Sequence, residues 1–213
     1  GIVAGNVVRE TGDDMIAVVN YGLGAPTVGN VLIEENDVSG QYWGRGITVV
    51  GGRDVTIRNN RISRTTVGAG ILIHSETSYD TADVRNVMIE GNVIRQVQTT
   101  APVYNPEQKN KETGHAAIDV YGQGSQHVSQ VLIRNNTIED VAHDGVQVRG
   151  NACDIGISGN KLSLVGGDPI YIASESDQSC PVSCSDNTLS GALVSDPSCR
   201  TGMPQVTGAS VLD

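Results

Sequence analysis

The chain has 213 residues with 26 Gly, no Phe and a net charge of −10. This charge argues against nucleic acid as a partner, because phosphate backbones are bound through Lys and Arg. No apolar run approaches the roughly 18 residues that span a bilayer, so no membrane partner is expected. The abundance of Val, Ile, Leu and Gly predicts short strands and tight turns rather than helices.

Near the N-terminus, Asp13 and Asp14 directly precede an alternating apolar stretch, residues 16–19. Two neighbouring acids are commonly just a solvated turn. Their position within the repeat described next changes this interpretation.

A repeat runs through the chain, in which an Asn follows a short apolar strand and precedes another apolar residue. The seven copies are centred on Asn6, Asn36, Asn60, Asn92, Asn136, Asn160 and Asn187. No 3.6-residue apolar period is present, so an array of helical repeats is not expected. Period-two strands of variable spacing, with Asn at a turn, indicate an all-β fold: a parallel β-helix of about seven coils. The stacked Asn side chains would hydrogen-bond one another at one bend of each coil, where Asn also tolerates a left-handed backbone conformation.

The repeat already includes residue 1. We therefore expect residues 1–213 to form one β-helix domain that lacks upstream coils and any export signal. A preceding segment of the same protein, or a second copy of the chain, would then be its partner.

Each of the first six copies continues through a variable loop into a second alternating strand, and these strands would stack as one sheet. They begin near Ile16, Ile47, Ile71, Ile118, Val146 and Ile170. Their outward side chains form two columns. The columns are Ala17, Thr48, Leu72, Asp119, Gln147, Tyr171 and Val19, Val50, His74, Tyr121, Arg149, Ala173.

The aromatic residues lie on this sheet or in its flanking loops, where Tyr and Trp suit stacking on sugar rings. They are Tyr21, Tyr42, Trp43, Tyr79, Tyr104, Tyr121 and Tyr171. Residues 75–86 and 95–116 are long enough to wall a groove. A glycan is therefore expected along the sheet, in contact with Trp43, Asp119, Tyr121, Gln147, Arg149 and Tyr171.

The cysteines fit the same register. Cys153 and Cys180 each stand four residues before equivalent positions of adjacent coils, which predicts a disulfide. Cys184 and Cys199 remain to pair at the C-terminal end. The spacing lacks the paired Cys-x-x-Cys knuckles of a zinc site. Disulfides imply an oxidising location, secreted or periplasmic.

The coils resemble the right-handed parallel β-helix of pectate lyases and polygalacturonases. Polygalacturonases and related β-helical glycoside hydrolases carry an Asp in one coil, then Gly-Asp-Asp, then Gly-His-Gly, then Arg-Ile-Lys in successive coils. Gly12-Asp13-Asp14 matches the second element, and the first would fall before residue 1. Gly44-Arg45-Gly46 takes the place of the third element and Leu72-Ile73-His74 that of the fourth. The Arg and Lys residues that bind a uronate carboxylate in polygalacturonases are absent here. The sequence therefore resembles β-helical α-glucanases, which implies a neutral glycan rather than a galacturonan.

The resemblance implies a glycoside hydrolase without a cofactor, with Asp14 as general acid and Asp13 as part of the base. Adjacent carboxylates repel, which pushes their pKa values apart and lets one hold a proton. Arg45 and His74 would orient the substrate or tune the acids. A lyase or epimerase on an acidic glycan, with calcium or Arg neutralising a carboxylate, is one alternative. A glycan-binding β-helix without activity is another.

Overall fold

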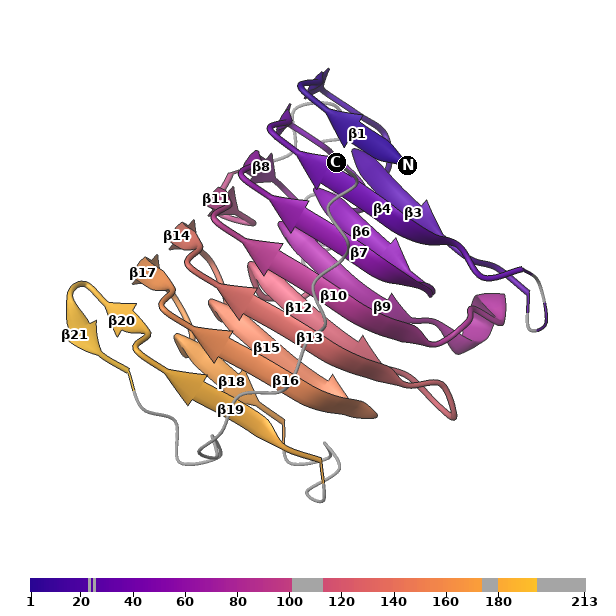
Figure 1. Cartoon of the computed structure of the whole chain (residues 1–213). Coiled ribbons are helices and arrows are strands. Elements are labelled where there is room, and N and C mark those ends of the chain that lie inside the picture. Colours follow the sequence, from indigo (N-terminus) through magenta and orange to yellow (C-terminus); the bar gives the residue numbers. More distant parts are fainter. Residues whose placement is uncertain (23, 25, 101–112, 174–179, 195–213) are drawn as a thin grey trace.

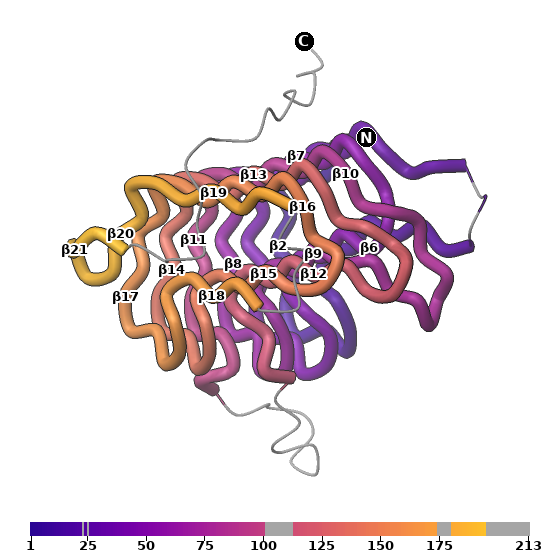
Figure 2. The backbone as a smooth tube through the Cα atoms, turned by 90° about the horizontal axis from the view of Figure 1, so that it is seen from below, coloured from indigo at the N-terminus to yellow at the C-terminus, as the bar shows by residue number. Residues whose placement is uncertain are grey.

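The computed structural model describes residues 1–22, 24, 26–100, 113–173 and 180–194. Within these ranges the secondary structure is β, apart from one turn of 3-10 helix, η1 (Thr77–Tyr79). The strands form three parallel sheets whose coils stack along one axis, from indigo to yellow in Figures 1 and 2. The predicted parallel β-helix is confirmed.

Sheet A, in front in Figure 1, contains β1 (Ile2–Ala4), β4 (Gly29–Glu34), β7 (Gly52–Arg58), β10 (Val84–Glu90), β13 (Val128–Arg134), β16 (Ala152–Ser158) and β19 (Val182–Ser185). Sheet B contains β2 (Val7–Arg9), β5 (Asp37–Ser39), β8 (Arg61–Thr65), β11 (Val93–Val97), β14 (Thr137–Val141), β17 (Lys161–Val165), β20 (Thr188–Leu189) and β21 (Ala192–Leu193). Sheet C contains β3 (Ile16–Val19), β6 (Ile47–Val50), β9 (Ile71–Ser75), β12 (Ile118–Gly122), β15 (Val146–Gly150) and β18 (Ile170–Ile172).

The coil count differs slightly from the expected seven. Sheet C has six strands, so the described residues form six complete coils. A seventh coil begins with β19 and β20, but the chain then turns back as β21, which pairs antiparallel with β20. Within the described part of this coil, β20 and β21 therefore form a hairpin, and the chain does not continue into a strand of sheet C.

The asparagine ladder lies at the bend between sheets A and B. Each Asn side chain donates to the next Asn Oδ1, as from Asn60 to Asn92 and from Asn92 to Asn136, both at 3.0 Å. The same Asn92 side chain also donates to the Ile57 carbonyl, at 2.9 Å. The inner ladder residues are buried, and these bonds satisfy amide groups that would otherwise be costly to bury.

The left-handed residue at this bend is not the ladder Asn, as expected from sequence, but the residue before it. Glu35, Asn59 and Asn135 have φ of 55°, 56° and 55°, and glycines take this position in other coils. A positive φ turns the chain sharply there, and the following Asn ties the turn to the neighbouring coil.

Inward Val, Ile and Leu side chains from all three sheets form one core. At the bend between sheets B and C the chain runs too close to this core for a side chain. A Cβ at Gly46, Gly70 or Gly145 would meet the side chains of Ile62, Ile94 and Leu162 respectively. These glycines therefore fix how closely sheet C packs on sheet B.

The predicted disulfide between Cys153 and Cys180 is present, with Cα atoms 4.8 Å apart. It forms because Ile157 and Cys184, four residues further on, are neighbours in the ladder of strands β16 and β19. The expected partner of Cys184, Cys199, lies outside the described residues.

Candidate functional site

The six strands of sheet C pair in the predicted register, with Ile16 opposite Ile47 and Ile71 opposite Ile118. The two outward columns therefore line up across the coils as expected. Their centre is covered rather than open, because Thr48, Leu72 and Asp119 have no exposed surface. These three side chains are therefore not available to a substrate on this face.

Asp14 stands at the edge where the chain enters sheet C. Its Oδ1 accepts the backbone N–H of Arg45 at 2.7 Å, and its Oδ2 accepts the Thr48 hydroxyl at 3.0 Å. Asp13 accepts the Asp14 N–H at 2.8 Å and stays exposed. Gly44, with φ of 84°, lets the next coil approach, because a Cβ there would meet both aspartates. The turn therefore aims Asp14 at the second coil.

Arg45 joins Asp14 to a second carboxylate at the opposite edge of the sheet. Its Nη1 lies 3.8 Å from Asp14 Oδ1, and its Nη2 lies 3.5 Å from Glu76 Oε1. Glu76 also contacts His74, with 3.2 Å between Oε1 and the imidazole Nδ1. The two carboxylate side chains are only 15% and 12% exposed, so solvent screens these contacts weakly.

The environments of these two acids shift their pKa values in opposite directions. Burial raises the pKa of Asp14, and this effect outweighs the lowering by Arg45 and by the Thr48 hydrogen bond. The contact with the His74 imidazole, at 3.2 Å, lowers the pKa of Glu76, and the charge of Arg45 adds to this effect. Asp14 is thus the acid that holds a proton more readily, and Glu76 the one that stays ionised.

A second cluster follows on the neighbouring coils. The imidazole of His74 stacks on the Tyr121 ring with centroids 4.8 Å apart, and the Arg149 guanidinium lies 4.2 Å from the Tyr121 centroid. Arg149 binds both oxygens of Asp119, at 3.2 and 3.3 Å. Because Asp119 is fully buried, it positions Arg149 rather than touching a ligand; burial also raises its pKa.

His115, near the entrance of the fourth coil, is a half-buried neutral imidazole. Burial lowers its pKa to about 3, with further contributions from the charges of Arg45, Arg149, His74 and His143. It therefore belongs to the same electrostatic environment as the two clusters.

Exposed aromatic rings border the site. Tyr21 and Tyr79 stack with centroids 5.3 Å apart and are 54% and 57% exposed. Burial and then the charge of Glu76 raise the pKa of Tyr21, which places this ring beside the acids. Trp43 and Tyr171 are 42% and 38% exposed. Tyr104 lies outside the described residues, as does most of the loop expected at 95–116.

The structure thus brings together Asp14, Arg45 and His74 from the sequence-based set. Tyr121, Arg149 and Asp119 form the adjoining cluster, whereas Gln147 has a buried Oε1 without a hydrogen-bond partner among the described residues. Sequence reasoning missed Glu76 and His115. Glu76 could have been found by extending the outward period one step beyond His74, into the loop.

Two further properties concern the described ranges only. No group of three or more His, Cys, Asp or Glu side chains there is arranged to hold a metal ion. Across the same ranges, no helix has the length and apolarity needed to cross a bilayer.

The three-sheet solenoid with its asparagine ladder defines a parallel β-helix protein. Residues 2–126 match the family described as right handed beta helix region, and the chain belongs to this family. No curated protein sequence matches the chain.

Among solved structures, the chain is similar to the catalytic domain of a GH87 alpha-1,3-glucanase in complex with tetrasaccharides. The TM-score is 0.56 at 17% identity, covering 88% of this chain and 45% of the glucanase domain. It also matches a tailspike protein of E. coli bacteriophage HK620 in complex with a pentasaccharide, with a TM-score of 0.37, 13% identity and coverage of 87% and 38%. The chain spans less than half of either protein, and the likeness to the glucanase concerns the fold.

Proposed function

We propose that the protein is a glycoside hydrolase in which Asp14 is the general acid and Glu76 the general base. The observation that carries this proposal is the pair of carboxylates whose pKa values shift in opposite directions around Arg45. Glycoside hydrolysis needs one carboxylic acid and one carboxylate, and environments that separate two pKa values assign these roles.

In this mechanism Asp14 donates its proton to the glycosidic oxygen as the bond to the anomeric carbon breaks. Glu76 takes a proton from the water that forms the new bond to that carbon. Asp14 and Glu76 contact different nitrogens of the Arg45 guanidinium, so they are separate carboxylates rather than a hydrogen-bonded pair. In inverting enzymes the two carboxyl groups stand roughly 6.5–9.5 Å apart, with the attacking water between the base and the sugar. Asp13 orients Asp14 through its backbone and is the alternative base.

The substrate in this proposal is a polysaccharide with neutral sugars at the acid pair. Support comes from the exposed Tyr21 and Tyr79 rings beside Glu76, since aromatic faces stack on sugar rings. Trp43, Tyr121, Arg149, Gln147 and Tyr171 supply further contacts along sheet C. The oligosaccharide complex of the similar glucanase domain agrees with this substrate class. The Cys153–Cys180 bridge supports an extracellular or periplasmic setting.

The test is product analysis on a panel of neutral and acidic polysaccharides. A hydrolase releases new reducing ends without an ultraviolet-absorbing unsaturated sugar. Asp14→Asn and Glu76→Gln should each lower turnover at least about 100-fold, the usual scale of acid–base catalysis, while oligosaccharide binding survives. Asp37→Asn, an exposed acid on sheet B paired with Arg9, is the control for loss of one carboxylate.

Asp13→Asn decides between the two candidate bases. A loss confined to Asp14 and Glu76 supports the assignment above, whereas a loss in Asp13→Asn with full activity in Glu76→Gln makes Asp13 the base. Full activity in an Asp14→Asn, Glu76→Gln double variant would end the hydrolase proposal.

A lyase acting on an acidic glycan is the second candidate. The observation in its favour is Tyr121, held between the His74 imidazole and the Arg149 guanidinium, groups suited to proton abstraction and to carboxylate neutralisation. An unsaturated product, abolished in Tyr121→Phe and retained in Asp14→Asn, would establish it. Binding without any product would leave a non-catalytic glycan-binding β-helix.

A further inference from the structure

A groove lies where the chain enters sheet A, apart from the candidate site. It has a volume of about 850 Å³ and is lined by the starts of β7, β10, β13 and β16, with the loops at Thr27 and Ala82 as one wall. None of the acids or aromatic rings assigned above lines it. This volume exceeds what a single inorganic ion needs and falls in the range of pockets that hold small organic ligands.

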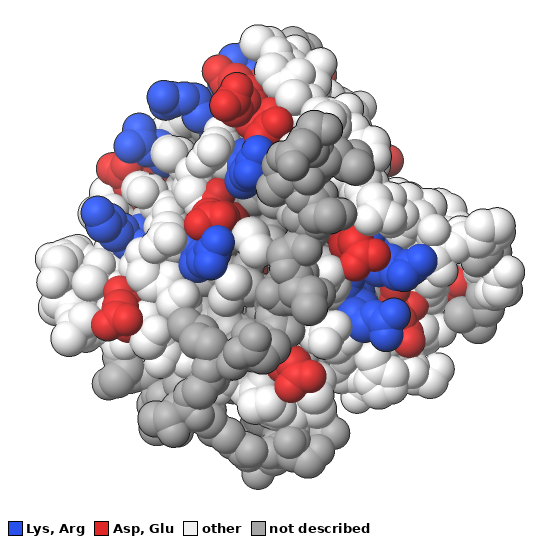
Figure 3. Space-filling model, in the orientation of Figure 1, with Lys and Arg blue, Asp and Glu red and all other residues white. Residues whose placement is uncertain are grey.

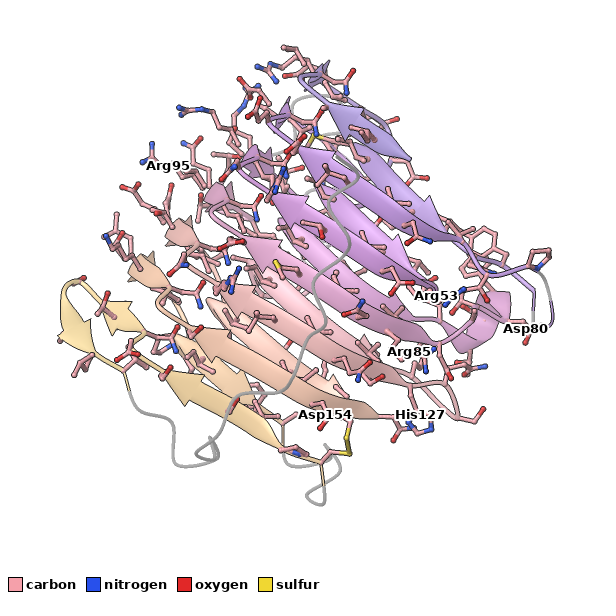
Figure 4. All side chains as sticks on the ribbon, viewed as in Figure 1. Arg53, Asp80, Arg85, Arg95, His127 and Asp154 are labelled. Carbon is pink, nitrogen blue, oxygen red and sulfur yellow. A yellow bond between two sulfur atoms is a disulfide. The ribbon has the colours of Figure 1, made fainter. Side chains whose placement is uncertain are left out.

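Two arginines stand side by side in this groove. Arg53 and Arg85 are direct neighbours in the register of β7 and β10, so their backbones lie about 4.8 Å apart. Arg85 makes no ion pair with any described residue, and Arg53 has one long contact, 3.7 Å from its Nη1 to Asp54 Oδ2. Figure 4 shows both arginines and His127 in a row along this edge of the sheet.

The far ends of the same strands show that this arrangement is not the rule for sheet A. There the charges alternate from coil to coil, and Arg58 binds Glu34 at 2.8 Å while Arg134 binds Glu90 at 2.9 Å. Acidic and basic side chains accordingly lie next to one another on this face in Figure 3. Like charges directly opposite are destabilising. The ladder neighbours of Arg53 and Arg85 are Gly29, each other and Ser129, so neither arginine has an acid directly opposite, and among the described residues only Asp54 on the same strand forms an ion pair with Arg53.

The other polar groups of the groove suit a sugar. Ser129 and Asn151 can exchange hydrogen bonds with hydroxyls, and His127 adds a ring donor. Asp83 is the single carboxylate among the lining residues, and one of its oxygens accepts the His127 backbone N–H at 2.8 Å. The Cys153–Cys180 disulfide forms part of the lining and fixes that end of the groove.

We propose that this groove binds an oligosaccharide bearing anionic groups, carboxylate or sulfate, through Arg53 and Arg85. The planar fork of Arg matches these oxyanions bidentately, and two forks one coil apart accept one charged sugar unit or two neighbouring ones. The site is thus chemically distinct from sheet C, where an acid pair faces neutral sugars. It is independent of the proposed hydrolysis.

The experiment is titration calorimetry with tetragalacturonate, sulfated maltotetraose, neutral maltotetraose and sodium sulfate. The Arg53→Gln, Arg85→Gln double variant should weaken binding of at least one charged tetrasaccharide about 10-fold or more. The control is Arg61→Gln, Lys161→Gln, which removes two exposed positive charges from sheet B and should change the Kd less than about 2-fold. Asp83→Asn should tighten binding.

Each contrary result overturns the proposal. Equal losses in the two double variants would indicate general attraction to positive charge. An unchanged Kd in Arg53→Gln, Arg85→Gln would place the charged sugar elsewhere. Binding of sodium sulfate as tight as that of the charged tetrasaccharides would reduce the groove to a free-anion site. Circular dichroism of each variant separates lost binding from lost fold.

Discussion

Asp14 and Glu76 bind the same guanidinium, that of Arg45, from opposite edges of sheet C, at 3.8 and 3.5 Å. The acids belong to the first and third coils and Arg45 to the coil between them. Three consecutive coils are therefore needed to build this pair. An insertion or deletion that shifts the register of one coil would separate Asp14 from Glu76 without altering either residue.

The first prediction concerns the pH dependence of the proposed hydrolysis. Activity requires protonated Asp14 and ionised Glu76, so it falls on the alkaline side as Asp14 ionises and on the acid side as Glu76 is protonated. Thr48→Val removes a hydrogen bond that lowers the pKa of Asp14. The alkaline limb of kcat/KM should move to higher pH while the acid limb stays. Thr56→Val, on sheet A, should move neither limb.

The second prediction concerns stability in acid. His115 has a pKa of about 3 in the folded chain and near 6.5 when unfolded, so only the unfolded chain gains its proton between these values. The free energy of unfolding therefore falls as the pH drops below 6.5. His115→Gln should reduce this loss by about 2 kcal/mol at pH 4.5, measured by urea titration against pH 7.5. An identical pH dependence in both proteins would contradict a His115 that is neutral in the folded chain.

The third prediction concerns the asparagine ladder. Asn92→Ala removes the acceptor for two groups of Asn60 and the donor to Ile57 and Asn136, all buried. The free energy of unfolding should fall by about 3 kcal/mol, because buried polar groups lose their partners. Asn6→Ala, at the exposed end of the ladder, should cost less than about 1 kcal/mol. Similar losses at both positions would mean that burial does not determine how much a ladder Asn contributes to the free energy of unfolding.

The fourth prediction concerns the disulfide that closes 27 residues between Cys153 and Cys180. Replacing both with Ser should lower the free energy of unfolding by roughly 3 kcal/mol in the chain-entropy picture. Denaturant titration measures this loss. Mass mapping of unreduced peptides checks the bridge itself and the pairing of Cys184 with Cys199, which stays a prediction. Free thiols at positions 153 and 180 would contradict the bridge.

The fold could be predicted in detail because each coil repeats the same local problem. Alternating apolar residues select the inward face, and an Asn at one bend aligns the coils. The register of sheet C and the partner of Cys153 could therefore be predicted from the sequence. The backbone conformation at the bend could not. Glu35 takes the left-handed conformation although its neighbour Asn36 is the better candidate by residue type, because the Asn36 side chain is needed for the ladder.

The candidate site was less predictable because its members come from loops as well as strands. His74 could be placed from the period of sheet C, and Arg45 from its position at the entrance of the second coil. Glu76 lies past the end of β9, so finding it required the alternation to be continued into the loop. The burial of Asp119 was also missed. A period of two separates inward from outward positions and carries no information on what covers the outward ones.

The ladder also gives the molecule a direction. From Asn36 to Asn160, each ladder Asn accepts a hydrogen bond from the Asn of the coil before it and donates one to the Asn of the coil after it. The amide dipoles therefore run head to tail along the solenoid axis and polarise one another. In a one-dimensional array formed by residues 1–213 alone, opening costs least at the first and last coils, which have a single neighbouring coil within these residues. Amide protons of the third to fifth coils should therefore exchange with solvent last, and the terminal coils should fray first.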